Sequence, residues 1–340
     1  MALASAVLFG ASTPLAKILL DAITPQMLAG LFYLGAGIGL AVVQIGRTTL
    51  GISAAEASLR REDLPWLAAV VILGGCLAPL LLMFGLQQTS ASSGSLLLNL
   101  EGLATMAIAW LVFRENVDGR LLLGAAAIVT GAVILTWDGE GIRFDGGGGL
   151  IAGACLAWGL DNNFTRKLSS ADPVITTVIK GLVAGSVNVG LALTAGSVLP
   201  PLPIIAAAAL VGFLGVGVSL ILFVLALRHL GTARTGAYFS LAPFIGAVVA
   251  ILLLGEPLTL QLALAGLLMG CGLWLHLAER HEHDHQHDIL AHDHSHVHDE
   301  HHWHKHDEAV TEPHSHWHRH EPIRHKHPHY PDLHHRHRHS

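Results

Sequence analysis

Two acidic side chains lie inside long apolar stretches of this chain, where a charged group is costly to place. Glu101 follows Asn99 in one stretch, and Asp161 opens the run Asp161-Asn162-Asn163 in another. A charge at the centre of a bilayer costs about 2.5–3.5 kcal/mol on insertion scales, so such residues are candidates for function. We therefore predict that these side chains bind a substrate. The alternative is a structural role, in which they hydrogen-bond neighbouring helices.

Lys180 is a third charged candidate, because it lies well inside a further apolar stretch. Its ammonium group could pair with Asp161 or with Glu101, or its long stem could carry the charge out to the membrane surface. A buried pair would neutralise the site, so that a substrate or a proton would have to compete with one member. The sequence leaves these arrangements open.

The C-terminal end of the chain is rich in His-x-His repeats, which place alternate side chains on one side of an extended strand. Neutral imidazole suits Zn, Ni and Cu, so the composition predicts transition-metal binding. This tail cannot bury a core and is expected to be disordered without metal. The predicted ligands come from two of the repeats: His281, His283, His285, His287, His292, His294, His296 and His298.

The composition separates an apolar region from this polar tail. Only 13% of the residues are charged and 52% are hydrophobic, whereas soluble domains carry about 25% charged residues. Of the 25 histidines, 23 lie between His281 and His339. The apolar region is therefore expected to lie in a membrane, and the net charge of −6 gives no sign of nucleic-acid binding. The three cysteines form no C-x-x-C pair, which argues against a zinc ribbon.

Ten apolar stretches approach the length of a membrane-spanning helix, which needs about 20 residues to cross a core of about 30 Å. They are residues 2–20, 26–45, 65–85, 91–113, 119–137, 149–168, 174–195, 203–227, 233–254 and 260–277. With a cytoplasmic N-terminus, nine Lys and Arg side chains fall in the inner loops and two in the outer loops. Because basic residues favour the cytoplasmic side, both termini are expected there.

The ten stretches form two similar halves. Gly94 and Gly236 are 142 positions apart, as are Ser90 and Thr232. Since each half has five spans, the second half must enter the membrane upside down. The predicted fold is an all-α membrane protein with ten transmembrane helices in two inverted five-helix repeats, followed by the disordered tail. The predicted divisions are a first repeat at 1–137, a linker at 138–148, a second repeat at 149–277 and the tail at 278–340.

The correspondence between the halves adds Ser12 and Thr13 to the candidate site. When Gly10 is aligned with Gly159, these two residues lie opposite Asp161 and its neighbouring amides. Polar interruptions at matching places in two inverted halves point to the binding site of a transporter.

Two short motifs add a family resemblance. Gly-Glu-Pro-Leu-Thr at Gly255–Thr259 follows the ninth stretch, and Arg-Glu-Asn-Val at Arg114–Val117 follows the fourth. With these motifs and the paired halves, residues 1–277 resemble the EamA-type transporters of the drug/metabolite transporter superfamily. The resemblance implies a multi-pass carrier of the plasma (inner) membrane, often an exporter, which moves small metabolites by alternating access. It does not give the substrate, and the His-rich tail departs from the family pattern.

The leading interpretation is a secondary transporter that exports a small organic metabolite, with Glu101 as the candidate for proton coupling. A divalent transition-metal exporter is one alternative, and a metal-responsive membrane scaffold or sensor without transport is another. No enzyme activity, no nucleic-acid partner and no cofactor for transport are expected. The expected partners are a small-molecule substrate, the lipid bilayer and transition-metal ions. Gly-x-x-x-Gly motifs beginning at Gly35, Gly181 and Gly266 predict close helix packing and leave a homodimer open.

Overall fold

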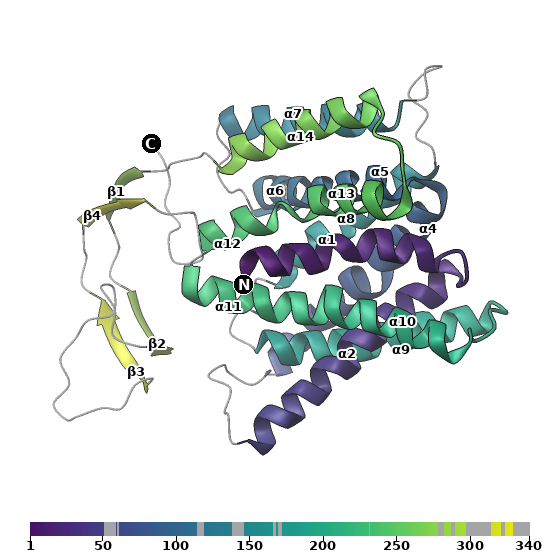
Figure 1. Cartoon of the computed structure of the whole chain (residues 1–340). Coiled ribbons are helices and arrows are strands. Elements are labelled where there is room, and N and C mark those ends of the chain that lie inside the picture. Colours follow the sequence, from purple (N-terminus) through teal and green to yellow (C-terminus); the bar gives the residue numbers. More distant parts are fainter. Residues whose placement is uncertain are drawn as a thin grey trace. The chain divides into compact units, whose positions relative to one another are not determined.

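The computed structural model describes residues 1–50, 59, 61–113, 119–137, 146–165, 168, 172–230, 232–277, 282–286, 290–296, 314–320 and 324–328. Residues 1–278 and 279–340 form two separate compact units. The first unit is a helix bundle, in which most of the long helices lie roughly side by side (Figure 1).

Helices follow one another through the first unit with short connections. They begin with α1 (Ala2–Leu19), α2 (Pro25–Thr49), η1 (Arg61–Asp63), α3 (Leu64–Val70), η2 (Val71–Leu77), α4 (Ala78–Gln88), α5 (Ala91–Leu97), α6 (Asn99–Phe113) and α7 (Gly119–Leu135). They continue with α8 (Gly146–Thr165), α9 (Pro173–Thr194), α10 (Leu202–Gly212), η4 (Phe213–Val218), α11 (Ser219–Leu230), α12 (Thr232–Phe239), α13 (Ala242–Leu254) and α14 (Leu260–Leu277). Of these, η2 and η4 are π-helical turns inside longer helical segments.

Helical segments occupy all ten ranges that were predicted to cross a membrane. Among the described residues, eight helical segments are long and apolar enough to span a bilayer. The apolar helix α7 is shorter, at 17 residues, and α8 carries Asp161 within its 20 residues. The prediction of an α-helical membrane region is therefore confirmed, while the count of ten spanning helices stays a prediction.

Glycines let α2 pack closely on neighbouring helices. Gly37 lies against Gly181 of α9, and Gly30 lies against Gly185. A Cβ atom on Gly35 would collide with the backbone of α10. Small residues thus allow helix backbones to approach, as predicted. Because these contacts lie within one chain, the motifs at Gly35 and Gly181 do not require a homodimer to explain them. The motif at Gly266 makes no such close contact, since the nearest atoms to the Cβ positions of Gly266 and Gly270 lie at 3.7 and 3.8 Å.

The second unit contains four short strands in its described segments. β1 (Glu282–Gln286) pairs antiparallel with β4 (Arg324–Pro328), and β2 (Leu290–His296) pairs antiparallel with β3 (His314–His320). An isolated two-stranded pair is only marginally stable in water, so the expectation of a tail that is disordered without metal stays a prediction.

Candidate functional site

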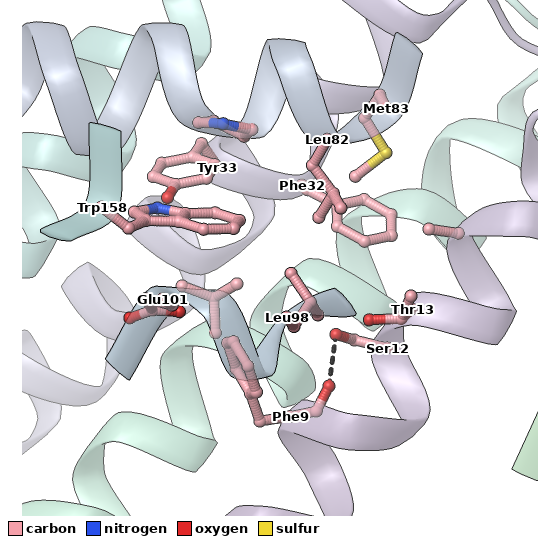
Figure 2. Close-up of a pocket in the computed structure, with 13 residues that line it drawn as sticks. Phe9, Ser12, Thr13, Phe32, Tyr33, Leu82, Met83, Leu98, Glu101 and Trp158 are labelled. Atoms are coloured by element: carbon pink, nitrogen blue, oxygen red, sulfur yellow. Dashed lines mark hydrogen bonds between the residues drawn. The ribbon is translucent and has the colours of Figure 1, made fainter. Parts of the chain in front are cut away.

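A cavity of about 110 Å³ lies inside the helix bundle. Helices α1, α2, α4 and α8, the turn η4 and the segment around Leu98 all contribute side chains to its walls. Figure 2 shows Tyr33 and Trp158 on one side of this space and Glu101 and Phe9 on the other. A cavity of this volume has room for several water molecules, so it suits a small ligand.

A break between two helices places Glu101 at the cavity. Leu98 separates α5 from α6, and the Asn99 side chain donates a hydrogen bond to the Leu96 carbonyl at 2.8 Å. Asn99 therefore adds a side-chain donor to a carbonyl at the end of α5, which also accepts the Leu98 N–H. The Glu101 carboxylate faces α8, where Asn162 Nδ2 donates to Oε1 at 3.0 Å.

The π-helical turn η2 fixes the two aromatic side chains of the opposite wall. Within this turn the Ala78 N–H donates to the Leu73 carbonyl, and the following residue, at position 79, is a proline without an N–H. The Gly74 carbonyl is therefore available to side chains. Tyr33 Oη donates to it at 2.7 Å and Trp158 Nε1 donates to it at 3.1 Å. A single backbone oxygen thus orients both rings.

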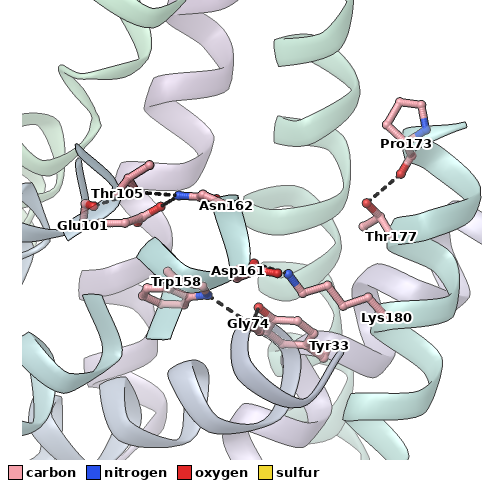
Figure 3. Close-up of polar contacts among 10 residues, drawn as sticks. All are labelled: Tyr33, Gly74, Glu101, Thr105, Trp158, Asp161, Asn162, Pro173, Thr177 and Lys180. Carbon is pink, nitrogen blue, oxygen red and sulfur yellow. Dashed lines mark hydrogen bonds and ion pairs between the residues drawn. The ribbon is translucent and has the colours of Figure 1, made fainter. Parts of the chain in front are cut away.

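Asp161 and Lys180 form an ion pair behind this aromatic wall. Lys180 Nζ lies 2.5 Å from Asp161 Oδ2, and the side chains are 16% and 6% exposed, respectively. Figure 3 shows the pair beside Gly74 and the Glu101–Asn162 contact apart from the pair. Gly74 is needed here, because a Cβ atom would collide with both members of the pair. Of the two pairings that the sequence left open, the structure contains the one between Lys180 and Asp161.

The other predicted site residues separate into two groups. Ser12 and Thr13 line the cavity, and Thr13 is buried. Asn163 instead donates to the backbone carbonyls of Gly159 and Thr105, at 2.8 and 3.1 Å. Asn163 therefore joins α8 to α6 and does not face the cavity, and Asn99 likewise bonds a helix end.

The aromatic cavity residues were missed by the sequence reasoning. Trp158 precedes Asp161 and Asn162 by three and four positions on α8, so all three lie on one helix face. This spacing could have identified Trp158. Tyr33 has no comparable signal, because its position depends on the Gly74 carbonyl that η2 makes available.

No group of three or more His, Cys, Asp or Glu side chains able to hold a metal ion occurs among the residues whose side chains the structure describes. The predicted tail ligands in described strands are His283, His285, His292, His294 and His296. The predicted ligands outside the described residues are His281, His287 and His298.

Two charged side chains from distant parts of the chain hold the turn between α4 and α5. Lys17 Nζ donates to the carbonyls of Leu86 and Thr89, at 2.5 and 2.9 Å. The Glu256 carboxylate accepts from the first two N–H groups of α5, at 2.7 and 2.8 Å. The cation contacts the C-terminal end of α4 and the anion contacts the N-terminal end of α5, so each charge interacts favourably with the helix dipole. The glutamate of the Gly-Glu-Pro motif thus caps a helix, while residues 114–117 lie outside the described residues.

Comparison with known proteins decides the family. The model of the EamA-like transporter family matches residues 1–137 and, a second time, residues 146–278. The chain belongs to the EamA-like transporter family. The two matches cover nearly all of the helical unit and leave out the His-rich tail.

Individual relatives of this EamA-like transporter support the family assignment. An uncharacterized transporter from Methanothermobacter thermautotrophicus is 30% identical over 283 residues, which cover 79% of this chain and 82% of the relative. A protein from Streptantibioticus cattleyicolor, named as a probable terminal-alkyne amino-acid exporter, is 25% identical over 246 residues, or 69% and 83% of the two chains. A solved crystal structure with 17% identity has a TM-score of 0.59 over 80% of this chain and 93% of its own, which shows the fold alone.

The family assignment fixes the broad class of the molecule. This EamA-like transporter is a multi-pass membrane protein, and its family and both relatives are transporters, not enzymes. The cavity is therefore a candidate for the site at which a small substrate is bound during transport.

Proposed function

We propose that this protein is a secondary transporter that moves a small organic metabolite through the cavity by alternating access. The observation that carries the proposal is the position of the helix interruptions. The turns η2 and η4 begin 142 positions apart, at Val71 and Phe213. The breaks after α5 and after α12 begin at Leu98 and Ser240, which are also 142 positions apart. Interrupted helices at matching places in two repeats are typical of transporter binding sites.

Three of these four interruptions adjoin the cavity or its aromatic wall. Leu98 and Val216 of η4 line the cavity, and Gly74 of η2 holds the rings of Tyr33 and Trp158. Kinks in long helices occur where the regular backbone hydrogen bonds are already interrupted. Bending at these points would open the cavity alternately to the two sides with little further loss of backbone bonding.

The proposed arrangement has ten spanning helices in two inverted repeats, with both termini cytoplasmic, in the plasma (inner) membrane. The excess of basic residues in the predicted inner loops supports it. So do the contacts of Lys17 and Glu256, because both residues and the α4–α5 turn fall on the outer side in this topology. Export is the proposed direction, since the relative from S. cattleyicolor is named as an exporter.

Transport by purified protein in proteoliposomes tests this proposal. A screen of organic cations, amino acids, organic acids and divalent metal ions should identify at least one organic solute that moves faster than in protein-free liposomes. Leu98→Trp, which fills the cavity, should abolish this flux. Leu123→Trp is the matched control, because Leu123 is 65% exposed on the outside of the bundle. Flux of divalent ions alone would support the metal exporter, and the absence of all flux would support the scaffold.

We also propose that the tail binds transition-metal ions as a cytoplasmic buffer or sensor. The strand register favours this function, because residues that alternate along a strand share a face and opposite residues are neighbours. In β2 and β3 the paired positions are His292 with His318, His294 with His316, and His296 with His314. In β1 and β4 they are His283 with His327 and His285 with His325.

A further inference from the structure

The ionisable side chains around the cavity do not balance in charge. Lys180 is paired with Asp161, so these two groups neutralise each other. Among the residues that the structure describes, the Glu101 carboxylate accepts a hydrogen bond only from the uncharged amide of Asn162, and no Lys or Arg side chain lies within ion-pair distance of it. With all three groups ionised, one negative charge remains, and it lies at the cavity. Electrostatic attraction is stronger in such a partly buried site than in water.

The aromatic side chains of the opposite wall favour the same kind of ligand as the Glu101 carboxylate, namely a cation. The polar atoms of Tyr33 and Trp158 are both bonded to the Gly74 carbonyl, which leaves their ring surfaces for the cavity. Phe9 and Phe32 add two further rings. Aromatic faces attract cations and pack well against apolar groups. The cavity therefore combines one unpaired carboxylate with several aromatic surfaces.

We propose that the cavity binds a monovalent organic cation carrying an aromatic or other apolar group, with Glu101 as its counter-ion and Trp158 and Tyr33 as the wall against which it packs. This inference rests on the proposed transport function and adds its substrate class. An anion would face Glu101 without compensation. A zwitterion such as an amino acid would need a partner for its carboxylate, and the ammonium group of Lys180 is already paired with Asp161.

Three compounds that share one benzyl group test the charge preference: benzyltrimethylammonium, phenylalanine and phenylacetate. Uptake of each is measured with the full-length protein in proteoliposomes at neutral pH. The cation should be taken up at least about tenfold faster than the zwitterion or the anion, because burial of an uncompensated charge is strongly unfavourable. Equal or faster uptake of phenylalanine or phenylacetate would overturn the proposed substrate class and leave transport itself established.

Calorimetric binding of benzyltrimethylammonium to the detergent-purified protein separates the two proposals. Binding without flux of any solute in the wider screen would support the cation site and overturn the transport function. Flux of other solutes, with no binding of the cation, would overturn the cation site and leave the transport function in place.

Matched variants test the role of Glu101. Glu101→Gln should weaken binding of benzyltrimethylammonium about 100-fold, because the amide cannot neutralise a buried cation. Glu256→Gln makes the same chemical change at the α4–α5 turn, away from the cavity, and should change the affinity less than about twofold. Size-exclusion chromatography checks that both variants are folded. Equal losses in the two variants would overturn the assignment of Glu101 as the counter-ion.

The aromatic wall is tested at Trp158. Trp158→Leu should weaken binding of the cation about tenfold, and Trp158→Phe should weaken it less, because a phenyl ring keeps part of the attraction. Equal affinity in the leucine variant and the natural protein would overturn the role of the ring.

Discussion

Two groups of charged side chains in the described helical unit of this transporter have different kinds of bonding partner. At the α4–α5 turn, Lys17 and Glu256 bond backbone carbonyls and N–H groups. In the lining of the cavity and behind its aromatic wall, Glu101, Asp161 and Lys180 form the cavity cluster and bond other side chains. A backbone partner is held by its helix, whereas a side-chain partner can change its rotamer and its bond. We infer that the turn is a structural clamp and that the cavity cluster is the part that changes during transport.

Glycines serve these two places differently. Gly74 and Gly75 provide space, because a Cβ atom on either would collide with atoms of the Asp161–Lys180 pair or of α9. Gly255 provides a backbone conformation, because its φ of 67° is left-handed and ends α13 directly before Glu256. Gly74 and Gly75 therefore make room for the ion pair, whereas Gly255 forms the tight turn that precedes Glu256 of the clamp.

Removal of one member of the ion pair should cause the largest loss of stability. Lys180→Met would leave the Asp161 carboxylate buried without its partner, and the free energy of unfolding should fall by about 3–5 kcal/mol. The double variant Asp161→Asn/Lys180→Met should recover most of this loss, because no unpaired charge remains. Chemical unfolding in detergent measures both values. If the single and double variants are equally stable, the pair is not coupled as the structure indicates.

An added methyl group at the ion pair should have the next largest effect. In Gly74→Ala the new Cβ atom would push on the Asp161 carboxylate and the Lys180 ammonium, so we expect a loss of about 1–3 kcal/mol and impaired transport. Gly190→Ala in α9 is the matched control, because no atom of the described residues other than its chain neighbours and its own helix backbone lies within 4 Å of its Cβ position. Similar losses in the two variants would show that the effect comes from helix glycines in general.

The charged residues of the cavity cluster could be predicted from the sequence, but their partners could not. Glu101, Asp161 and Lys180 stand out because charges inside apolar stretches are costly. The structure places Glu101 in the lining of the cavity and the Asp161–Lys180 pair behind its aromatic wall. Whether Lys180 would meet Asp161 or Glu101 depends on the rotation of α9 relative to α8. Residue spacing within each helix does not define that rotation.

The helices, too, could be predicted from the sequence, but their interruptions could not. Apolar length located the helical segments, because a bilayer-crossing segment has a defined length. The interruption at Leu98 and the turn η2 were not predicted. Asn99 follows Leu98 and Pro79 follows η2 in the sequence, but neither residue type by itself defines how the backbone hydrogen bonds of a helix change. Asn99 was consequently predicted to bind substrate, although its side chain bonds the Leu96 carbonyl.

Neutralisation of the clamp should have a smaller effect than changes at the cavity. Glu256→Gln keeps one acceptor oxygen and loses the other, so the free energy of unfolding should fall by about 1 kcal/mol. Transport should stay within about twofold of the natural protein, because the cavity is unchanged. A folded Glu256→Gln protein without transport would contradict the division between clamp and cavity, and would place the α4–α5 turn among the moving parts.

Truncation after Glu279 should have the smallest effect on transport, because the tail forms a compact unit separate from the helical one. Uptake of organic solutes should continue at the rate of the full chain. Calorimetry with Zn or Ni should show several binding sites on the full chain and none on the truncated chain. Binding should weaken as the pH falls below about 6.5, since only neutral imidazole binds a metal. Loss of all transport in a correctly inserted truncated protein would instead make the tail part of translocation and favour the metal exporter.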